Sequence, residues 1–271
     1  MIFSSKTMNL NIKNAVGFLT FKKLENIKFV NHAFSTRLGG VSSGPFATLN
    51  LSRKSKDNPD NIEENLKRIC NAANFPRESL YFLNQNHTSN IKVVKSNDHD
   101  SNIYDGSITN VKGITLVTSH ADCAPIFFVD PVTKSIGLAH AGWKGTVSNI
   151  AGKMVSKMQA EYGSSPKDII CAIGPCIHNC CFEIQDDIIS YFTKIDKNLV
   201  EFKNNKIYAN IPECNKINLL NSGISDSNII VSDLCTKCNH DLFFSHREQG
   251  KDRGGMLAYV TIFLSLVILI I

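Results

Sequence analysis

The stretch GITLVTSHADCAPIFFVDPVTKSIGLAHAGWKG, residues 113–145, decides the fold of this chain. It contains three short apolar runs bounded by turn residues, a pattern that predicts buried β-strands over 113–118, 124–129 and 135–139. Asp130-Pro131 separates the last two runs and is a turn signal, so we expect them to form an antiparallel hairpin. A fourth apolar run within 90–95 predicts a further strand.

Two stretches outside this region have helical periodicity. In 62–73, one face of the expected helix is apolar, with Ile62, Leu66, Ile69 and Ala73. A second helix is expected after Gly145, capped by Thr146 or Ser148. Hairpins mixed with separate helices predict an α+β fold rather than a doubly wound parallel sheet. Because no linker, repeat or low-complexity block interrupts the sequence, we expect a single domain.

The composition excludes several classes of protein. The chain has 271 residues, 43% of them apolar and 20% charged, which is typical of a globular domain and excludes a disordered chain, a collagen or a coiled coil. The net charge of +5 is spread along the chain, so no nucleic-acid partner is expected, and an anionic small substrate is compatible with it. Nine cysteines without a visible secretory signal indicate a cytoplasmic protein whose thiols are mostly reduced.

The C-terminal residues 256–271, MLAYVTIFLSLVILII, form a run of sixteen residues without a charge. A membrane-spanning helix needs about 20 apolar residues, and β-branched residues favour a strand. We therefore expect a last core strand with an apolar extension. Membrane contact through this tail is the alternative and is not favoured.

Three polar side chains near the ends of the expected strands are candidates for chemistry: His87, Cys123 and His140. Two imidazoles and one thiolate suit Zn²⁺ and leave a fourth position open, as in catalytic sites. Copper also accepts these ligands. Each residue taken alone is more often a hydrogen-bonded histidine or a packed thiol, and 36 and 17 residues separate them.

Other cysteines and basic residues are further candidates for metal or anion binding. Cys235 and Cys238 form a CxxC pair followed by His240, whereas the upstream set Cys176, Cys180 and Cys181 has irregular spacing. We therefore favour packing thiols near an active site over a structural zinc. Since no Walker loop or GxGxxG motif is present, anion binding is expected from Arg37 beside Gly39-Gly40, with Lys144 and Arg247 as further candidates.

Taken together, the motifs resemble the purine nucleoside phosphorylase family also described as multicopper polyphenol oxidase or laccase-domain proteins. They are FSTRLGGVS (34–42), LNLS (49–52), QNH (85–87), ADCAP (121–125), HAGWKG (140–145), IGPCI (173–177), CFEI (181–184), CTKC (235–238) and FFSHRE (243–248). The resemblance predicts a catalytic domain over 28–264, an N-terminal segment 1–27 leading into it, and an apolar extension over 265–271.

The resemblance implies a layered α-β-β-α sandwich with mixed sheets, similar to the cytotoxic-necrotizing-factor-like cysteine hydrolase fold. It implies that His87, Cys123 and His140 bind the metal, usually zinc and in some cases copper, and carry catalysis. It also implies phosphorolysis of adenosine, inosine, guanosine and 5′-methylthioadenosine, with adenosine deamination as a second activity. Arg37 then binds phosphate with help from Lys144 and Arg247, Asp122 orients a ligand or moves a proton, and the protein is a monomer or homodimer.

The sequence departs from the family pattern at three places. Lys144 stands where arginine is usual, His246 where tyrosine is common, and 250–255 retains Arg253 within a degenerate Thr-Gly-Arg motif. Three alternatives stay open: a copper polyphenol oxidase, a metal-stabilised binding protein at a membrane, and a cysteine hydrolase using Cys123. The oxidase is poorly supported, because the eight histidines include no His-x-His pair.

Overall fold

The computed structural model describes residues 3–98 and 100–263, and two six-stranded sheets dominate it. The first sheet has the order β1-β2-β3-β15-β7-β4, with β1 Met8–Lys13, β2 Val16–Phe21, β3 Val30–Ser35, β15 Met256–Ile262, β7 Thr115–His120 and β4 Leu80–Phe82. The second has the order β14-β10-β8-β9-β6-β5, with β14 Ile229–Val231, β10 Ile170–Ile173, β8 Ala124–Asp130, β9 Ser135–Ala141, β6 Gly106–Thr109 and β5 Ile91–Val93. Both sheets contain parallel and antiparallel pairs, which confirms the mixed α+β class.

The predicted hairpin is the centre of the second sheet. Strands β8 and β9 pair antiparallel from Ala124 opposite Ala141 to Asp130 opposite Ser135. Both strands are buried along their whole length because each face of this sheet packs against another layer. Alternate residues of β8 therefore enter different cores: Phe127 packs between the two sheets, whereas Phe128 packs against helices.

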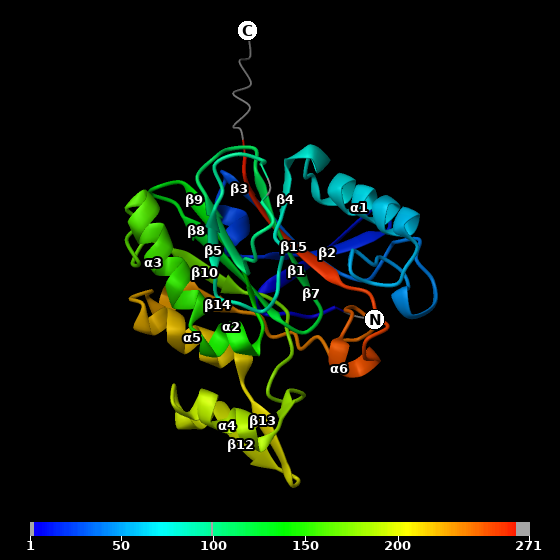
Figure 1. Cartoon of the computed structure of the whole chain (residues 1–271). Coiled ribbons are helices and arrows are strands. Elements are labelled where there is room, and N and C mark those ends of the chain that lie inside the picture. Colours follow the sequence, from blue (N-terminus) through cyan, green and yellow to red (C-terminus); the bar gives the residue numbers. More distant parts are fainter. Residues whose placement is uncertain (1–2, 99, 264–271) are drawn as a thin grey trace.

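The chain forms four layers (Figure 1). Helix α1 (Pro59–Ala73) covers the outer face of the first sheet, and α3 (Ile150–Tyr162) and α5 (Ile211–Asn221) cover the outer face of the second. The core between the sheets contains large side chains from both of them, including Phe34 and Phe127, together with Phe243 from the loop before α6. This is the α-β-β-α arrangement that the resemblance implies.

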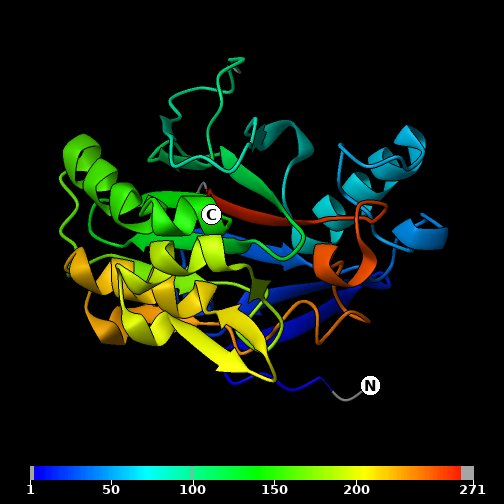
Figure 2. The same cartoon turned by 60° about the horizontal axis from the view of Figure 1, so that its bottom comes forward.

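The remaining elements are short or lie at the edge of the sandwich. A three-stranded sheet, β11 Glu183–Ile184, β13 Lys206–Ala209 and β12 Val200–Lys203, packs with α4 (Asp186–Thr193) and comes forward in Figure 2. Helix α2 (Trp143–Val147) follows β9, and α6 (His246–Gln249) precedes β15. Five single-turn 3-10 helices complete the described chain: η1 Leu24–Asn26, η2 Gly44–Phe46, η3 Arg77–Ser79, η4 Lys197–Leu199 and η5 Asp226–Asn228.

Two boundary predictions need correction. The helix expected after Gly145 is divided into α2 and α3, and Asn149 caps α3 by accepting a hydrogen bond from Gly152 N at 2.9 Å. Thr146 is instead buried and hydrogen-bonded to Asn215, so neither predicted cap is used. At the N-terminus, the segment 1–27 contributes β1 and β2 to the first sheet and does more than lead into the domain.

The C-terminal prediction is confirmed where the structure describes it. Residues 256–262 form β15, a fully buried strand between β3 and β7. The apolar extension over 265–271 lies outside the described residues. Within the described ranges, no helix has the length and apolar character needed to cross a membrane.

Candidate active site

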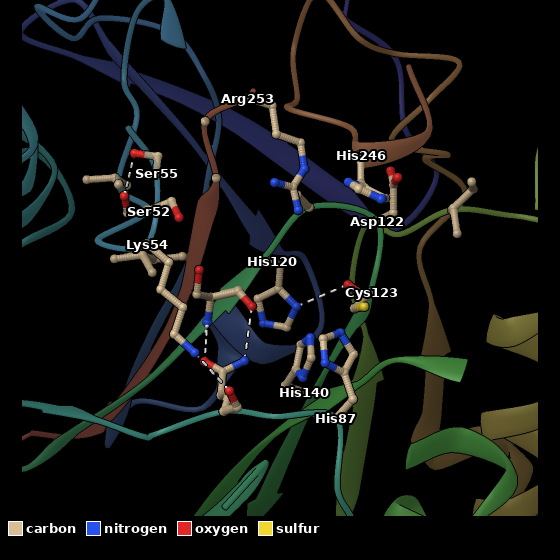
Figure 3. Close-up of a pocket in the computed structure, with 18 of the residues that line it drawn as sticks. Ser52, Lys54, Ser55, His87, His120, Asp122, Cys123, His140, His246 and Arg253 are labelled. Carbon is tan, nitrogen blue, oxygen red and sulfur yellow. Dashed lines mark hydrogen bonds between the residues drawn. The ribbon is translucent and has the colours of Figure 1, made fainter. Parts of the chain in front are cut away.

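The topology brings His87, Cys123 and His140 together from three separate segments. His140 lies near the end of β9, opposite Pro125 of β8, and Cys123 immediately precedes β8. His87 lies in the loop between β4 and β5, with a left-handed φ of 59°. One ligand atom from each of the three side chains lies within 4.8 Å of the others. The close-up in Figure 3 shows these three side chains close together among the residues that line a cavity.

A buried carboxylate that the sequence analysis missed, Asp105, organises this cluster. Its Oδ1 accepts hydrogen bonds from the backbone N–H of His87 at 3.0 Å and from His140 Nδ1 at 2.8 Å. Its Oδ2 accepts from Asn86 N, Thr88 N and Thr88 Oγ1. Asp105 therefore fixes the loop that presents His87 and directs the free Nε2 of His140 toward the cluster, as partners of metal-bound histidines do.

The pKa values of Cys123, His140 and Asp105 are shifted by interactions within the cluster. Burial opposes ionisation of the Cys123 thiol, but the charge of His140 and hydrogen bonds from His140 and His87 lower its pKa to about 6. Burial also disfavours charge on His140, yet the Cys123 thiolate and Asp105 raise the pKa of His140 to about 9. Against its own burial, hydrogen bonding to His140 lowers the pKa of Asp105 to about 2. Cys123 is therefore a thiolate at neutral pH, the form that binds metal.

The donor set fits a metal ion. One thiolate, one imidazole held in a single tautomer by Asp105 and a second imidazole on an anchored loop are three ligands of the type zinc prefers. Cys123, His140 and Asp105 also have the connectivity of a Cys–His–Asp hydrolase triad. Such a triad does not require His87, which adds a second imidazole hydrogen-bonded to the Cys123 sulfur.

His120 lies beside the cluster, but it is not a fourth ligand. Its Nδ1 is 3.0 Å from the Cys123 carbonyl oxygen and must donate to it, while its Nε2 is 2.7 Å from Thr118 Oγ1. Burial and the charge of His140 lower its pKa well below the ordinary value, so the ring is neutral. His120 therefore holds the Cys123 backbone in place.

Because Gly142 has no side chain, His87 and Cys123 can lie close to the backbone at this position. A Cβ at this position would lie 2.8 Å from His87 Cδ2 and 3.1 Å from Cys123 Sγ. Gly142→Ala is therefore expected to displace both ligands and to weaken metal binding about 10-fold or more, measured by competition with a chromophoric chelator. The control Gly113→Ala, at a φ of +80° with open space around it, should cost about 1 kcal/mol of stability without changing metal affinity. Equal affinity in both variants would contradict this role for Gly142.

A cavity of about 930 Å³ opens above the cluster. Its lining combines apolar side chains with a group of cationic ones: Phe82, Trp143, Phe182, Ile211, Arg53, Lys54, Lys144, Arg247, Lys251 and Arg253. The Arg53 guanidinium lies 4.1 Å from the centre of the Phe82 ring. An aromatic wall beside positive charge suits a flat heterocycle that carries or meets an anion.

Arg253 is the cation best placed to meet an anion in this cavity. Its buried Nε has no hydrogen-bond partner in the described part of the chain. Burial lowers the pKa of its guanidinium, and the nearby negative charges of Asp122 and Cys123 oppose that effect. Figure 3 shows the guanidinium directed toward His120 and Cys123. The guanidinium is half-buried and lines the cavity, and leaving its Nε unpaired is costly, so the arrangement favours an incoming anion on the cavity side.

Arg37, the residue expected to bind phosphate, does not line this cavity. Its Nε and Nη2 donate to the Ala47 carbonyl oxygen at 2.9 and 2.6 Å, and its Nη1 donates to His240 O at 2.8 Å. The guanidinium also stacks 4.6 Å from the centre of the Phe244 ring. Arg37 therefore ties two loops together.

The other predicted residues line the cavity in different ways. Asp122 has a φ of +88° and accepts hydrogen bonds from Thr236 Oγ1 and the Arg247 backbone N–H, both at 2.7 Å, so it anchors the cavity wall. The Arg247 side chain donates to Glu183 O at 2.7 Å and lies over Phe182. Lys144 is exposed, with its Nζ 5.7 Å from the centre of the Trp143 ring.

Comparison with known proteins agrees with these features. The family described as multi-copper polyphenol oxidoreductase laccase matches residues 31–263. A Mus musculus protein named purine nucleoside phosphorylase LACC1 is 38% identical over 239 residues, which cover 85% of this chain and 55% of the relative. The chain thus spans about half the length of that mammalian relative. Purine nucleoside phosphorylase YlmD of Bacillus subtilis is 33% identical over 249 residues, covering 87% of this chain and 90% of the relative.

Solved structures show the same fold. The crystal structure of YlmD from Geobacillus stearothermophilus superposes with a TM-score of 0.87 at 31% identity, covering 95% of this chain and 99% of that chain. The Bacillus licheniformis hypothetical protein YfiH gives a TM-score of 0.86 at 30% identity, with 94% and 98% covered. On the family match and these relatives, the chain belongs to the multi-copper polyphenol oxidoreductase laccase family, whose curated relatives include proteins named purine nucleoside phosphorylase.

Proposed function

We propose that this chain is a metal-dependent purine nucleoside phosphorylase that converts a purine nucleoside and phosphate to the free base and ribose 1-phosphate. One observation carries the proposal: Arg253, whose Nε has no hydrogen-bond partner among the described residues, lines the same aromatic-lined cavity as the His87–Cys123–His140 cluster. The relatives named purine nucleoside phosphorylase support it. Adenosine, inosine, guanosine and 5′-methylthioadenosine are the proposed substrates.

Phosphorolysis needs an anion held beside the sugar and a site for the departing base. A phosphate oxygen forms a bond to ribose C1′, the C1′–N9 bond breaks, and the purine leaves with the bonding electron pair and takes up a proton. Arg253 binds and orients the phosphate, because its charged, half-buried guanidinium lines the cavity and its Nε has no hydrogen-bond partner among the described residues. Phe182 and Trp143 provide the aromatic surface for the purine.

The metal is proposed to be zinc, and copper is compatible with the same ligands. Held by His87, Cys123 and His140, it supplies Lewis-acid chemistry and activation of water, which is also what hydrolytic deamination of adenosine requires. We include adenosine deamination as a proposed second activity. Asp105 holds the Nδ1 proton of His140 throughout, so His140 keeps the tautomer that binds metal.

The test of the function is a chromatographic assay of the metallated protein with each of the four nucleosides, with and without phosphate. At least one nucleoside is expected to give free base and ribose 1-phosphate in a phosphate-dependent manner. Inosine formed from adenosine without phosphate would support the deaminase activity. No conversion of any of the four by a protein with a measured metal content would overturn the proposed function.

The copper oxidase alternative requires a second, histidine-rich cluster, and the described residues do not provide one. In 3–98 and 100–263, two groups of three or more metal-ligating side chains occur, and one of them is composed of cysteines alone. Multicopper oxidases combine a mononuclear site with several further histidine-bound coppers. Copper above one ion per chain together with oxygen consumption in the presence of a phenol would favour this alternative.

Replacing Arg253 distinguishes the two arginines proposed for phosphate. Arg253→Gln is expected to raise the KM for phosphate about 10- to 100-fold with little change in kcat, because a charge-assisted hydrogen bond is lost. Arg37→Gln is the matched control, since it should cost about 1–3 kcal/mol of stability through the lost bonds to Ala47 and His240 but leave the KM for phosphate unchanged. The reverse pattern would restore Arg37 as the phosphate ligand.

A further inference from the structure

We propose that Cys180, Cys181, Cys235 and Cys238 bind a second metal ion, a zinc held by four thiolates, which fastens together two segments of the cavity wall. These residues lie in two stretches separated by more than fifty positions, and their irregular spacing in the sequence favours packing thiols. In the structure, all four Sγ atoms lie within 4.8 Å of one another. The proposal concerns this site alone and is independent of the reaction at His87, Cys123 and His140.

The spacing of the sulfur atoms suits a metal better than a disulfide. Cys238 Sγ lies 3.6 Å from Cys180 Sγ and 3.4 Å from Cys181 Sγ. Tetrahedral zinc with Zn–S bonds of about 2.3 Å places its sulfurs roughly 3.8 Å apart, whereas a disulfide requires about 2.05 Å. All nine cysteines of the chain are free thiols in the structure. Four sulfurs converging on one point at this separation form the donor set of a closed structural zinc site.

The backbone assembles the two cysteine segments independently of a metal. Cys176 and Cys235 form an isolated parallel β-bridge, and Thr236 N donates to Cys176 O at 2.9 Å. On one side a turn closes with Cys181 N donating to His178 O at 2.9 Å, and on the other Asn239 N donates to Cys235 O at 3.1 Å. The ligand set is therefore preformed, which lowers the entropy cost of binding the ion. Cys180 and Cys238 are exposed, so an ion can enter from solvent.

The two cysteine segments lead into residues that line the cavity. The first cysteine segment continues into Phe182, and the second leads to Arg247, and both side chains line the cavity. Arg247 donates to Glu183 O across the two segments at 2.7 Å, and Asp122 accepts from both Thr236 and Arg247 on the second segment. A zinc ion linking 180–181 to 235–238 would therefore fix the positions of Phe182 and Arg247, the aromatic and cationic parts of this wall, relative to each other.

The experiment measures zinc per chain in the purified full-length protein after exchange against a mild chelator. Wild type is expected to hold two zinc ions. The double variant His87→Ala/Cys123→Ala, which removes the first site, should keep one, and Cys180→Ser/Cys238→Ser should also keep one. Cys214→Ser, a buried thiol on α5 outside both clusters, should keep two and controls for the general cost of replacing a buried cysteine.

X-ray absorption at the zinc edge identifies the ligands without relying on a variant of the second site. In His87→Ala/Cys123→Ala the remaining zinc is expected to have four sulfur neighbours at about 2.3 Å. Absence of zinc from that variant, a coordination shell of nitrogen or oxygen, or a native disulfide among the four cysteines found by mass spectrometry would overturn the proposal. Loss of nucleoside turnover has no bearing on these measurements, so the two proposals can fail separately.

Discussion

Replacing Asp105 with alanine is expected to weaken metal binding strongly and to lower turnover with it, although the Asp105 side chain is not itself among the predicted ligands. The carboxylate is 0% exposed and accepts five hydrogen bonds, from Asn86, His87, Thr88 and His140. Its removal leaves the backbone N–H groups of Asn86, His87 and Thr88 without this acceptor and frees the His140 ring. We expect metal affinity to fall about 10- to 100-fold and stability by about 3–5 kcal/mol.

Two further variants distinguish the role of Asp105 in positioning the metal ligands from a general loss of stability. Asp130 is also fully buried and accepts from the Val132 and Thr133 backbone N–H groups at the far end of β8. Asp130→Ala should lower the melting temperature without changing metal affinity. Asp105→Asn keeps a hydrogen-bond acceptor, and an excess of zinc should restore its turnover because all three ligands remain. Failure of zinc to restore activity would mean that Asp105 acts in the reaction itself.

The contribution of Asp105 to stability depends on pH in a defined direction. Its pKa is lowered from 3.8 to about 2 in the folded protein, chiefly by hydrogen bonding to His140 working against burial. A lowered pKa stabilises the folded state above the ordinary value, and that stabilisation is lost as the pH falls toward about 2. The difference in unfolding free energy between wild type and Asp105→Asn should therefore shrink as the pH falls below 4. A difference that stays constant would contradict the assigned cause.

Replacing Cys123 with alanine is the second prediction with a large effect. The variant removes the sole sulfur ligand of the His87–Cys123–His140 cluster and should reduce phosphorolysis at least about 1,000-fold. The estimate follows because Lewis-acid stabilisation supplies several kcal/mol and each 1.4 kcal/mol is a factor of ten in rate. Excess zinc should not restore it, in contrast to Asp105→Asn.

The control for Cys123→Ala is Cys171→Ala. Cys171 is a buried thiol in β10, paired with β8 and β14 at a distance from the cavity lining. This variant should lose stability and keep its metal and its kcat. Phosphorolysis that survives in Cys123→Ala at a rate near that of wild type would place the chemistry elsewhere.

Local sequence pattern was sufficient to predict the central part of the fold. Runs of apolar residues bounded by turn signals correctly identified β7, β8 and β9, because these strands are buried on both faces and their pattern is not interrupted. The cap of α3 was missed since Asn149 takes a left-handed conformation between two helices, which periodicity does not reveal. The implied four layers are present, and the likeness to the toxin-type hydrolase fold stays a prediction.

Site residues could be predicted from the sequence where the residue type alone suggests a metal ligand. They could not be predicted where the role of a residue depends on its tertiary contacts. His87, Cys123 and His140 stand out by residue type near strand ends. Asp105 does not, because its role depends on hydrogen bonds to a loop 18 residues before it and a strand 35 residues after it. Arg37 sits in a glycine-rich motif that suggests anion binding, yet its donors satisfy carbonyl groups, whereas Arg253 lies in a degenerate motif and faces the cavity.

The four-cysteine cluster likewise could not be predicted from sequence spacing alone. The CxxC pair at 235–238 was visible, but its partner half, two adjacent cysteines at 180 and 181, matches no familiar spacing. A parallel β-bridge between Cys176 and Cys235 brings the halves together, and pairing of that kind depends on the whole sheet topology.

Incubation of the metallated wild type with adenosine and ¹⁸O-labelled phosphate tests the central claim most directly, with the products read by mass spectrometry. Attack of a phosphate oxygen on C1′ predicts adenine and ribose 1-phosphate that retains every labelled oxygen, including the one bonded to C1′. Free ribose without label would show that water, not phosphate, is the nucleophile. That result, or no conversion of adenosine, inosine, guanosine or 5′-methylthioadenosine by protein of measured metal content, would contradict the account.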